Sequence, residues 1–278
     1  MSSPARAQLA DNRVMTNPHS PRPSALSPEP WSYDAIAGVY ATDMGRSMPF
    51  DDVGWYRAVC RAQGGTALEL GCGTGRILIE LLAEGIDAIG ADRSLPMLRQ
   101  LRRDAKARGI DPRVAQMDLR ALAFAAAFDA ILLPYSLITY VTHREQAVAV
   151  LAGLRALLTP TGVIVLDAFV PQPVISFEDF RLDYRRAHGD RTLERHKRIA
   201  ANADGTNRIE RRYRLFDAGG ALRDEFFTDE TIRPYAPDAL QALAVAAGYE
   251  IARWAWDYDT RPDAHGARFA TAVLHTRT

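Results

Sequence analysis

Between residues 66 and 170 the hydrophobic positions form short apolar runs that alternate with stretches of helical spacing. The apolar runs predict five strands, at residues 66–70, 86–91, 113–117, 128–134 and 163–167. The stretches that repeat apolar residues three and four positions apart predict helices at residues 75–84, 94–107 and 144–158. Buried apolar strands separated by helices are typical of a parallel sheet with helices on both faces. The pattern therefore predicts a doubly wound α/β fold.

The segments on either side of this alternation have different patterns. Before it, residues 31–44 and 51–61 predict two helices, the first with Ser32 as its N-cap. After it, residues 177–233 are polar with interspersed large apolar residues, and glycine-containing pairs mark hairpin turns at 189–190, 204–205 and 219–220. This pattern predicts an antiparallel insertion of three or four strands. A helix and two strands then return the chain to the sheet, at residues 237–247, 249–256 and 268–275.

The first 30 residues differ in composition from the rest. They are rich in serine and contain six prolines but few large apolar residues. Such a segment buries too little surface to offset the entropy of ordering it, so we predict a disordered tail over residues 1–30. We divide the remainder into an N-terminal helical segment, residues 31–62, and a sheet-forming domain, residues 63–278, which contains the insertion.

Composition narrows the functional class. Lys plus Arg (34) equals Asp plus Glu (34), and because a general nucleic-acid binder usually carries a basic excess, we expect no nucleic-acid partner. The two cysteines, Cys60 and Cys72, show no metal-ligand spacing. They favour a reducing compartment, the cytoplasm, and argue against a disulfide framework or a metal site. The longest apolar runs are of strand length, so we expect no association with a membrane.

A glycine-rich loop carries the candidate chemistry. The sequence Leu-Glu-Leu-Gly-Cys-Gly-Thr-Gly-Arg, residues 68–76, joins the first predicted strand to the first helix of the sheet, where open α/β sheets bind their ligands. Glycines at 71, 73 and 75 let the backbone turn sharply and approach a ligand closely. The spacing is Gly-x-Gly-x-Gly, and Arg76 stands where the dinucleotide fingerprint has its third glycine. A ligand without a pyrophosphate is therefore favoured.

Acidic residues follow the next two strands. Asp92 ends the second strand, where a carboxylate can accept hydrogen bonds from both hydroxyls of a ribose. Asp118 follows the third strand, where it can accept from an exocyclic adenine amine, and the N–H of Leu119 beside it can meet a ring nitrogen. Glu69 opens the glycine loop near the expected cationic end of the ligand.

The series Glu69-x-Gly71-x-Gly73-x-Gly75, Asp92 and Asp118-Leu119 resembles the nucleotide-site signature of class I S-adenosylmethionine-dependent methyltransferases. The resemblance covers about residues 63–170 and implies a mostly parallel seven-stranded sheet of order 3-2-1-4-5-7-6, with the antiparallel insertion after strand five. The opening Tyr-Asp-x-Ile-Ala-x-x-Tyr, residues 33–40, resembles the helical lid of small-molecule methyltransferases. The end of the insertion is similar to that of sugar N,N-dimethyltransferases and glycine N-methyltransferase-like enzymes.

The resemblance implies an activity and residue roles. The activity is methyl transfer from S-adenosylmethionine, which leaves S-adenosylhomocysteine, to a nitrogen or oxygen of a small-molecule acceptor, in a setting such as secondary metabolism. In the implied site Tyr33 and Tyr40 close over the cofactor, and a backbone carbonyl after strand four accepts a hydrogen bond from the methionine amine. The residues expected to bind the cofactor are Tyr33, Tyr40, Glu69, Gly71, Cys72, Gly73, Gly75, Asp92, Arg93, Met97, Asp118, Leu119, Pro134 and Tyr135. Many relatives have Asn-Ser after strand four where this chain has Tyr135-Ser136.

Three residues near the expected acceptor are candidates for catalysis. His143 follows strand four and either acts as an acid or base or caps the helix that begins at Arg144. Tyr140 either contacts the acceptor or packs in the core. Asp167, at the end of strand five, either orients an amine or hydroxyl or satisfies loop amides.

Other functions stay open at this point. A nicotinamide-dependent oxidoreductase would use a related fold, although Arg76 disfavours it. A protein or nucleic-acid methyltransferase would be expected to carry a basic surface or an Asn/Asp-Pro-Pro-Tyr-type loop where this chain reads Leu-Pro-Tyr-Ser, residues 133–136. The chain could also bind the cofactor without catalysis. The insertion has a basic run at residues 181–198 that either is solvated or pairs with an acidic acceptor, and its free edges suggest a homodimer through the insertion.

Overall fold

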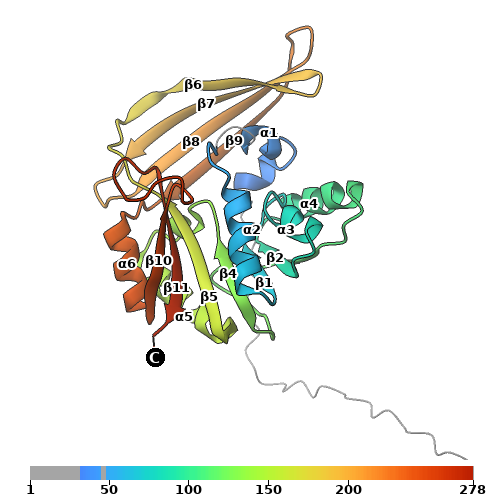
Figure 1. The fold of residues 1–278 in the computed structure, drawn as a ribbon. Helices are drawn as coiled ribbons and strands as arrows, with labels where there is room; N and C mark the ends of the chain where they lie inside the picture. The colour runs from blue at the N-terminus through green and yellow to red at the C-terminus, as the bar shows by residue number, and fades with distance from the viewer. Residues whose placement is uncertain (1–31, 45–47, 278) are drawn as a thin grey trace, which may run out of the picture.

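Seven strands form the central sheet of the computed structural model, which describes residues 32–44 and 48–277 (Figure 1). They are β1 (Ala67–Leu70), β2 (Ala88–Asp92), β3 (Arg113–Gln116), β4 (Phe128–Leu133), β5 (Leu158–Phe169), β10 (Tyr249–Trp256) and β11 (Phe269–Thr276). Their order is β3-β2-β1-β4-β5-β11-β10, and β11 runs antiparallel to both of its neighbours. With β10 and β11 counted as strands six and seven, this confirms the predicted order.

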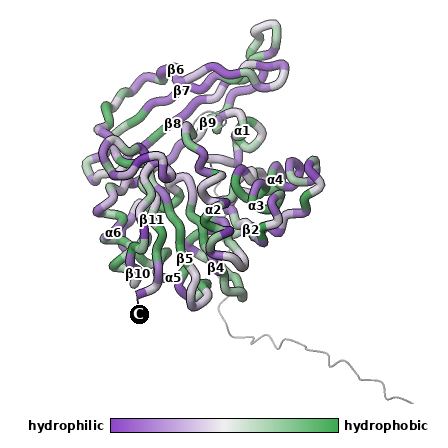
Figure 2. The backbone as a smooth tube through the Cα atoms, viewed as in Figure 1, coloured by the Kyte–Doolittle hydropathy of each residue, from purple (hydrophilic) through white to green (hydrophobic). Residues whose placement is uncertain are grey.

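Helices cover both faces of the central sheet (Figure 1). One face is covered by α2 (Asp52–Gln63), α3 (Leu78–Ala83) and α4 (Leu95–Ala107), and the other by α5 (Arg144–Leu154) and α6 (Pro237–Ala246). Successive side chains of a strand point to opposite faces. In β4, Ala130 and Leu132 therefore join the core under α2–α4, while Ile131 and Leu133 join the core under α5 and α6. Figure 2 shows hydrophobic residues concentrated in these strands and helices.

The insertion forms a second sheet of four antiparallel strands in sequence order. Its strands are β6 (Phe177–His188), β7 (Arg191–Ala201), β8 (Asn207–Phe216) and β9 (Leu222–Ile232). The connections lie at the three predicted glycine-containing turns. Most of the basic run is paired: Arg185 contacts Glu194, and Arg195 and Lys197 contact Asp183. Arg186, Arg191 and Arg198 contact acids or carbonyls nearby, and Arg181 lies over the ring of Phe177.

The N-terminal segment, residues 32–44, lies between the insertion and the central domain (Figure 1). It consists of a 3-10 helix, η1 (Ser32–Ile36), and a short α-helix, α1 (Tyr40–Met44). Ile36 and Val39 pack with Leu193 and Tyr213 of the insertion and with Met97 of α4. The segment therefore joins the two sheets through one small hydrophobic cluster.

Several predicted boundaries were wrong, for local reasons. One helix was predicted over residues 31–44, but Gly38 lies in a turn between η1 and α1, as expected for a residue that disfavours helix interiors. The helix predicted from Gly75 begins at Leu78, because Gly75 has a φ of 88° and its N–H bonds to the carbonyl of Cys72. The predicted tail, residues 1–30, lies outside the described residues.

The end of the predicted helix 144–158 also differs. It becomes a 3-10 turn, η3 (Arg155–Leu157), and β5 begins at Leu158, earlier than predicted. In the described part of the chain, no helix is both long and apolar enough to span a membrane.

Candidate functional site

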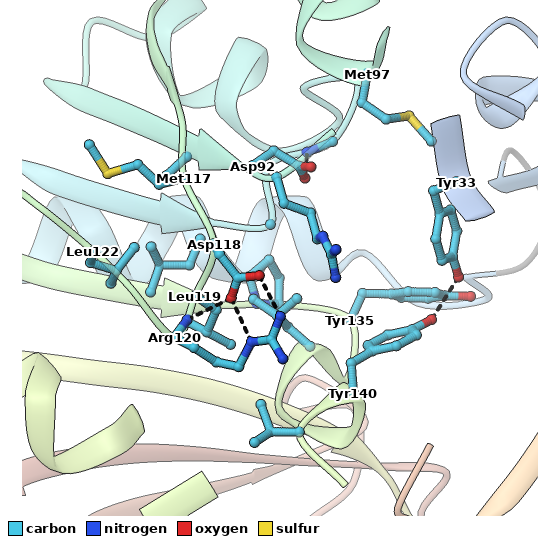
Figure 3. Close-up of a pocket in the computed structure, with 18 of the residues that line it drawn as sticks. Tyr33, Asp92, Met97, Met117, Asp118, Leu119, Arg120, Leu122, Tyr135 and Tyr140 are labelled. Atoms are coloured by element: carbon cyan, nitrogen blue, oxygen red, sulfur yellow. Dashed lines mark hydrogen bonds and ion pairs between the residues drawn. The ribbon is translucent and has the colours of Figure 1, made fainter. Parts of the chain in front are cut away.

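A pocket opens where β1, β2 and β4 end, beside the N-terminal segment (Figure 3). Its empty volume is about 1050 Å³, including the part open to solvent, which is ample for a small-molecule ligand. The described residues that line it are Tyr33, Tyr40, Leu70, Gly71, Gly73, Ala91, Asp92, Arg93, Met97, Met117, Asp118, Leu119, Arg120, Leu122, Pro134, Tyr135, Leu137, Tyr140 and Val141. The pocket thus has a glycine loop in its wall, carboxylates along one side and tyrosines at one end.

The glycine loop approaches the pocket without side chains. Gly71 and Gly73 have φ values of 66° and 53°, in the left-handed region that glycine adopts without steric cost. A Cβ on Gly73 would have only the Gly71 carbonyl and the Tyr40 ring nearby, both at 3.9 Å. The backbone here leaves a space that a ligand can fill.

Asp92 is held by the loops on either side of it. Its Oδ2 accepts a hydrogen bond from the N–H of Gly73 at 2.8 Å, and its Oδ1 accepts from the N–H of Ser94 at 2.7 Å. Burial raises the pKa of this carboxyl, and the two N–H donors oppose the rise. Each oxygen keeps a second acceptor position, so Asp92 can accept two further hydrogen bonds from a ligand in the pocket.

Asp118 has a partner that the sequence analysis did not identify. The Arg120 Nε and backbone N–H donate to Oδ1 at 2.8 and 2.9 Å, and Nη2 donates to Oδ2 at 2.7 Å (Figure 3). These bonds to Arg120 lower the pKa of Asp118. Apolar side chains surround the pair, with Met117, Leu119 and Leu122 in the same wall. This end of the pocket suits a flat apolar ring with a polar edge.

Tyrosines gather at the other end of the pocket (Figure 3). The hydroxyls of Tyr33 and Tyr140 share a hydrogen bond of 2.6 Å, and their rings meet edge to face with centroids 6.1 Å apart. The rings of Tyr33 and Tyr40 also meet edge to face, at 5.8 Å. Burial raises the pKa of Tyr135 to about 12 and the pKa of Tyr33, Tyr40 and Tyr140 as well, so all four phenols are protonated at neutral pH.

Comparison with known proteins gives a consistent result. Residues 67–162, which span β1 to the start of β5, match a family model described as a methyltransferase domain. The demethylmenaquinone methyltransferase of Thermus thermophilus is 29% identical over 193 residues, 66% of this chain and 74% of that protein. The chain is an S-adenosylmethionine-dependent methyltransferase.

Solved structures agree on the fold of this methyltransferase. The CcbJ methyltransferase from Streptomyces caelestis superimposes with a TM-score of 0.73 at 21% identity, covering 89% of this chain and 99% of that one. The sugar N-methyltransferase KedS8 from Streptoalloteichus superimposes with a TM-score of 0.67 at 22% identity, covering 96% of this chain and all of the other.

Twelve of the residues predicted for the site line the methyltransferase pocket: Tyr33, Tyr40, Gly71, Gly73, Asp92, Arg93, Met97, Asp118, Leu119, Pro134, Tyr135 and Tyr140. Gly75 and Cys72 lie behind the loop. A Cβ on Gly75 would come within 2.7 Å of Leu101, and Cys72 is buried in the core under α2–α4. His143 is exposed at the N-cap position of α5, makes no side-chain capping bond, and is not among the residues that line the pocket.

Glu69 and Asp167 are buried carboxylates just outside the pocket wall. Burial raises the pKa of Glu69 to about 8, an effect that the nearby Arg76 opposes, and its Oε2 has no hydrogen-bond partner. Asp167 is fully buried and accepts bonds from Ser136, Tyr56 and Tyr258. A carboxyl group behind the glycine loop with one unpartnered oxygen can give up its proton when a positive charge binds nearby, so it fits a cofactor that carries positive charge.

Apolar lining residues that were not predicted from the sequence lie at strand ends or in the loops that follow them: Leu70, Ala91, Met117, Leu122, Leu137 and Val141. For Leu70, Ala91, Met117 and Val141, the position directly before or after a predicted site residue was an available signal. Arg120 was also missed, although it follows Asp118 by two residues.

Proposed function

We propose that this methyltransferase transfers a methyl group from S-adenosylmethionine to a small molecule, with nitrogen favoured over oxygen as the acceptor. The observation that carries the proposal is the composition of the pocket. Among the described residues that line it, the carboxylates are Asp92 and Asp118, away from the tyrosine end, and there is no histidine, lysine or cysteine. A neutral amine needs no base to attack a methyl group, whereas a hydroxyl gains from one. Similarity to the sugar N-methyltransferase KedS8 supports the same class.

Within this proposal, residues at different places along the pocket contact different parts of the cofactor. Asp92 accepts from the ribose hydroxyls, and Asp118, Arg120 and Leu119 contact the adenine. Gly71 and Gly73 receive the methionine portion, with the carbonyl of Pro134 or Tyr135 as acceptor for its amine. Glu69 behind the loop stabilises its positive charge. Tyr33 and Tyr40, on the N-terminal segment, act as a lid.

The protein contributes mainly positioning. S-adenosylmethionine supplies a methyl group that its sulfonium has already activated. The chain has to hold the acceptor about 3 Å from that carbon and in line with the leaving sulfur. The tyrosine rings present faces of partial negative charge, which attract a cationic centre. Tyr140 and Tyr135 are the candidates for contact with the acceptor, while the exposed position of His143 does not support its role as a base.

Thermal unfolding with S-adenosylhomocysteine, with NADH in parallel, tests the proposal. A ligand at a hundred times its dissociation constant stabilises the native state by about 2.7 kcal/mol, or roughly 5–10 °C for a domain of this size. We expect this shift with S-adenosylhomocysteine alone. Asp92→Ala should weaken binding at least ~10-fold, because it removes the acceptor for the ribose and for the Gly73 N–H.

Asp87→Ala is the matched control, because Asp87 precedes the opposite end of β2 and pairs with Arg113 at the surface. A shift with NADH alone would contradict the cofactor assignment. Binding of S-adenosylhomocysteine without turnover on any amine or alcohol would instead indicate a protein that binds the cofactor without catalysis.

We also propose that two copies associate through the outer face of the insertion, the face directed away from α1. In its middle, directly paired positions place Leu182, His196, Arg212 and Phe227 in one row across the four strands. Leu182 and Phe227 are 55% and 53% exposed.

Cys60 and Cys72 are buried free thiols, which supports a reducing compartment such as the cytoplasm.

A further inference from the structure

Two short segments have backbone conformations that most residues avoid. In the described chain, the non-glycine residues with positive φ are Tyr135 and Ser136, at 55° and 58°, and the run 257–259, at 47° to 66°. Such conformations are strained for residues with a Cβ and persist only where surrounding contacts hold them. The two segments are more than 100 residues apart in sequence, yet both contact the same side chain.

That side chain is Asp167, at the end of β5. The N–H of Ser136 donates to its Oδ1 at 2.6 Å, and the hydroxyls of Tyr258 and Tyr56 both donate to its Oδ2 at 2.7 Å. Asp167 is fully buried. Two residues further along β5, the N–H of Phe169 donates to the Ser136 hydroxyl at 2.8 Å. The end of β5 therefore holds the turn after β4 at two points.

This turn shapes the pocket. Pro134, Tyr135 and Leu137 all line it, whereas Asp167 does not. The Tyr135 ring packs edge to face against Phe169, with centroids 5.4 Å apart. If Ser136 returned to an ordinary backbone conformation, the direction of the chain at Tyr135 would change, and with it the pocket wall.

We propose that Asp167 is a positioning residue: it holds Tyr135 and Ser136 in their left-handed conformation and thereby fixes the wall of the pocket that faces the methyl acceptor. The role rests on the proposed function, because it assigns that wall to the cofactor and acceptor. It differs from a role as a base or as a ligand of the acceptor, since the carboxylate acts through hydrogen bonds to the backbone and to two phenols.

Two substitutions at one position separate positioning from charge. Asp167→Ala leaves the Ser136 N–H without an acceptor. We expect it to weaken S-adenosylhomocysteine binding ~10-fold and to lower kcat/KM for an amine acceptor ~100-fold, as misplacement of reacting groups does. Asp167→Asn keeps an oxygen toward Ser136, and its NH₂ can donate to the Tyr56 and Tyr258 phenols, which then accept. It should recover most of both losses.

Tyr56→Phe is the matched control. It removes a donor from the same carboxylate, but from Oδ2 rather than from the oxygen that binds Ser136. We expect a lower unfolding midpoint with S-adenosylhomocysteine affinity and kcat/KM within about threefold of wild type. Amide hydrogen exchange provides a readout without any acceptor: Ser136 should exchange faster in Asp167→Ala and not in Tyr56→Phe.

The outcomes are distinct. If Asp167→Asn is as impaired as Asp167→Ala, the charge itself is required and the proposal is wrong. If Tyr56→Phe lowers S-adenosylhomocysteine affinity and kcat/KM as much as Asp167→Ala does, Asp167 acts only as a general core residue. This result would also overturn the proposal. If Asp167→Ala does not fold, Asp167→Ser replaces it, because its shorter side chain cannot bridge to Ser136. Failure of wild type to bind S-adenosylhomocysteine would reject the proposed function, and the exchange of Ser136 would still decide the positioning role.

Discussion

At the scale of single residues, Glu69 carries a prediction about pH. Its folded pKa is about 8 because of burial, while an unfolded glutamate has a pKa near 4.3. The folded state therefore holds a proton that the unfolded chain releases between these values, so stability is lost as the pH rises from about 4.5 to 8, by at most ~1.4 kcal/mol per pH unit. Glu69→Gln should remove this slope, as measured by urea unfolding at pH 5, 6, 7 and 8.

Glu80→Gln is the control for that measurement. Glu80 lies on the exposed side of α3, where its bond to Arg108 lowers its pKa, so its contribution has the opposite sign and is small because solvent screens the pair. A wild-type slope that survives in Glu69→Gln would show that another group titrates.

In the proposed site, S-adenosylhomocysteine should also release a proton from Glu69 at pH 7, detectable by calorimetry in buffers of different ionisation enthalpy.

The pocket positions that the sequence predicted best are those at strand ends. Asp92 and Asp118 line the pocket because Asp92 is the last residue of β2 and Asp118 lies two residues after β3, and the carboxyl ends of these parallel strands meet at one edge of the sheet. The partner of Asp118 and the bonds of Asp167 were not predictable in this way. Both depend on loop conformations, including the positive φ of Ser136, that the residue types alone do not specify.

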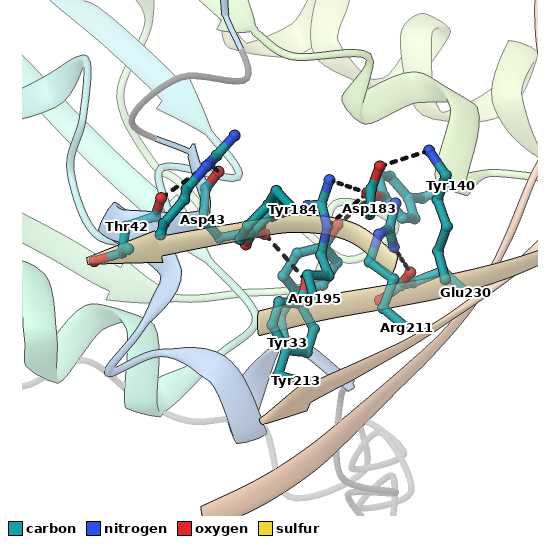
Figure 4. A network of polar contacts seen from close by, with 12 residues as sticks. Tyr33, Thr42, Asp43, Tyr140, Asp183, Tyr184, Arg195, Arg211, Tyr213 and Glu230 are labelled. Carbon is teal, nitrogen blue, oxygen red and sulfur yellow. Dashed lines mark hydrogen bonds and ion pairs between the residues drawn. The ribbon is translucent and has the colours of Figure 1, made fainter. Parts of the chain in front are cut away.

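At the scale of elements, the alternation of apolar runs and helical spacing predicted the central sheet and the turns of the insertion. The N-terminal segment was harder, because α1 has only five residues and short helices gain little from their own hydrogen bonds. Its place is set by contacts with distant strands. Tyr184, Tyr213 and Arg195 of the insertion all donate to the carboxylate of Asp43 (Figure 4).

Asp43→Asn should therefore loosen the N-terminal segment from the insertion. Asp43 is 4% exposed, and the variant leaves one acceptor oxygen for three donors and removes a partner of the buried Arg195. Breaking a buried pair costs about 3–5 kcal/mol, and we expect ~2–4 kcal/mol here because Arg195 also contacts Asp183. Urea unfolding measures the loss, and binding of S-adenosylhomocysteine should weaken because Tyr40 belongs to the same short helix.

Asp229→Asn provides the comparison on the same sheet. Asp229 pairs with Arg208, and both side chains are about half exposed; surface pairs of this kind contribute about 0–1 kcal/mol. Losses of similar size in the two variants would contradict a special role for Asp43.

At the scale of the whole molecule, the insertion has two faces of different character. The inner face covers the N-terminal segment, with Leu193, Tyr213 and Leu215 buried. The outer face carries Leu182 and Phe227 in the open, and the His196 Nδ1 and Arg212 Nε atoms are buried without hydrogen-bond partners. Buried polar atoms of this kind are usually satisfied in native proteins. Glu194 and Glu225 lie opposite Arg214 on the neighbouring strands. A second copy packed on this face would cover the apolar side chains and bring these two glutamates close to the arginines of its partner.

Analytical ultracentrifugation tests the dimer. Wild type should sediment as a dimer at micromolar concentration, and Phe227→Asp should sediment as a monomer, because the carboxylate would be buried without a partner at the centre of the interface. Val245→Asp is the control: Val245 is also a large apolar residue, 45% exposed, but it lies on α6 of the central domain. This variant should remain dimeric. A monomeric wild type, or dissociation by both variants alike, would mean that the outer face of the insertion is not the interface. Since the inner face, not the outer, contacts the N-terminal segment, the monomeric variant should still bind S-adenosylhomocysteine.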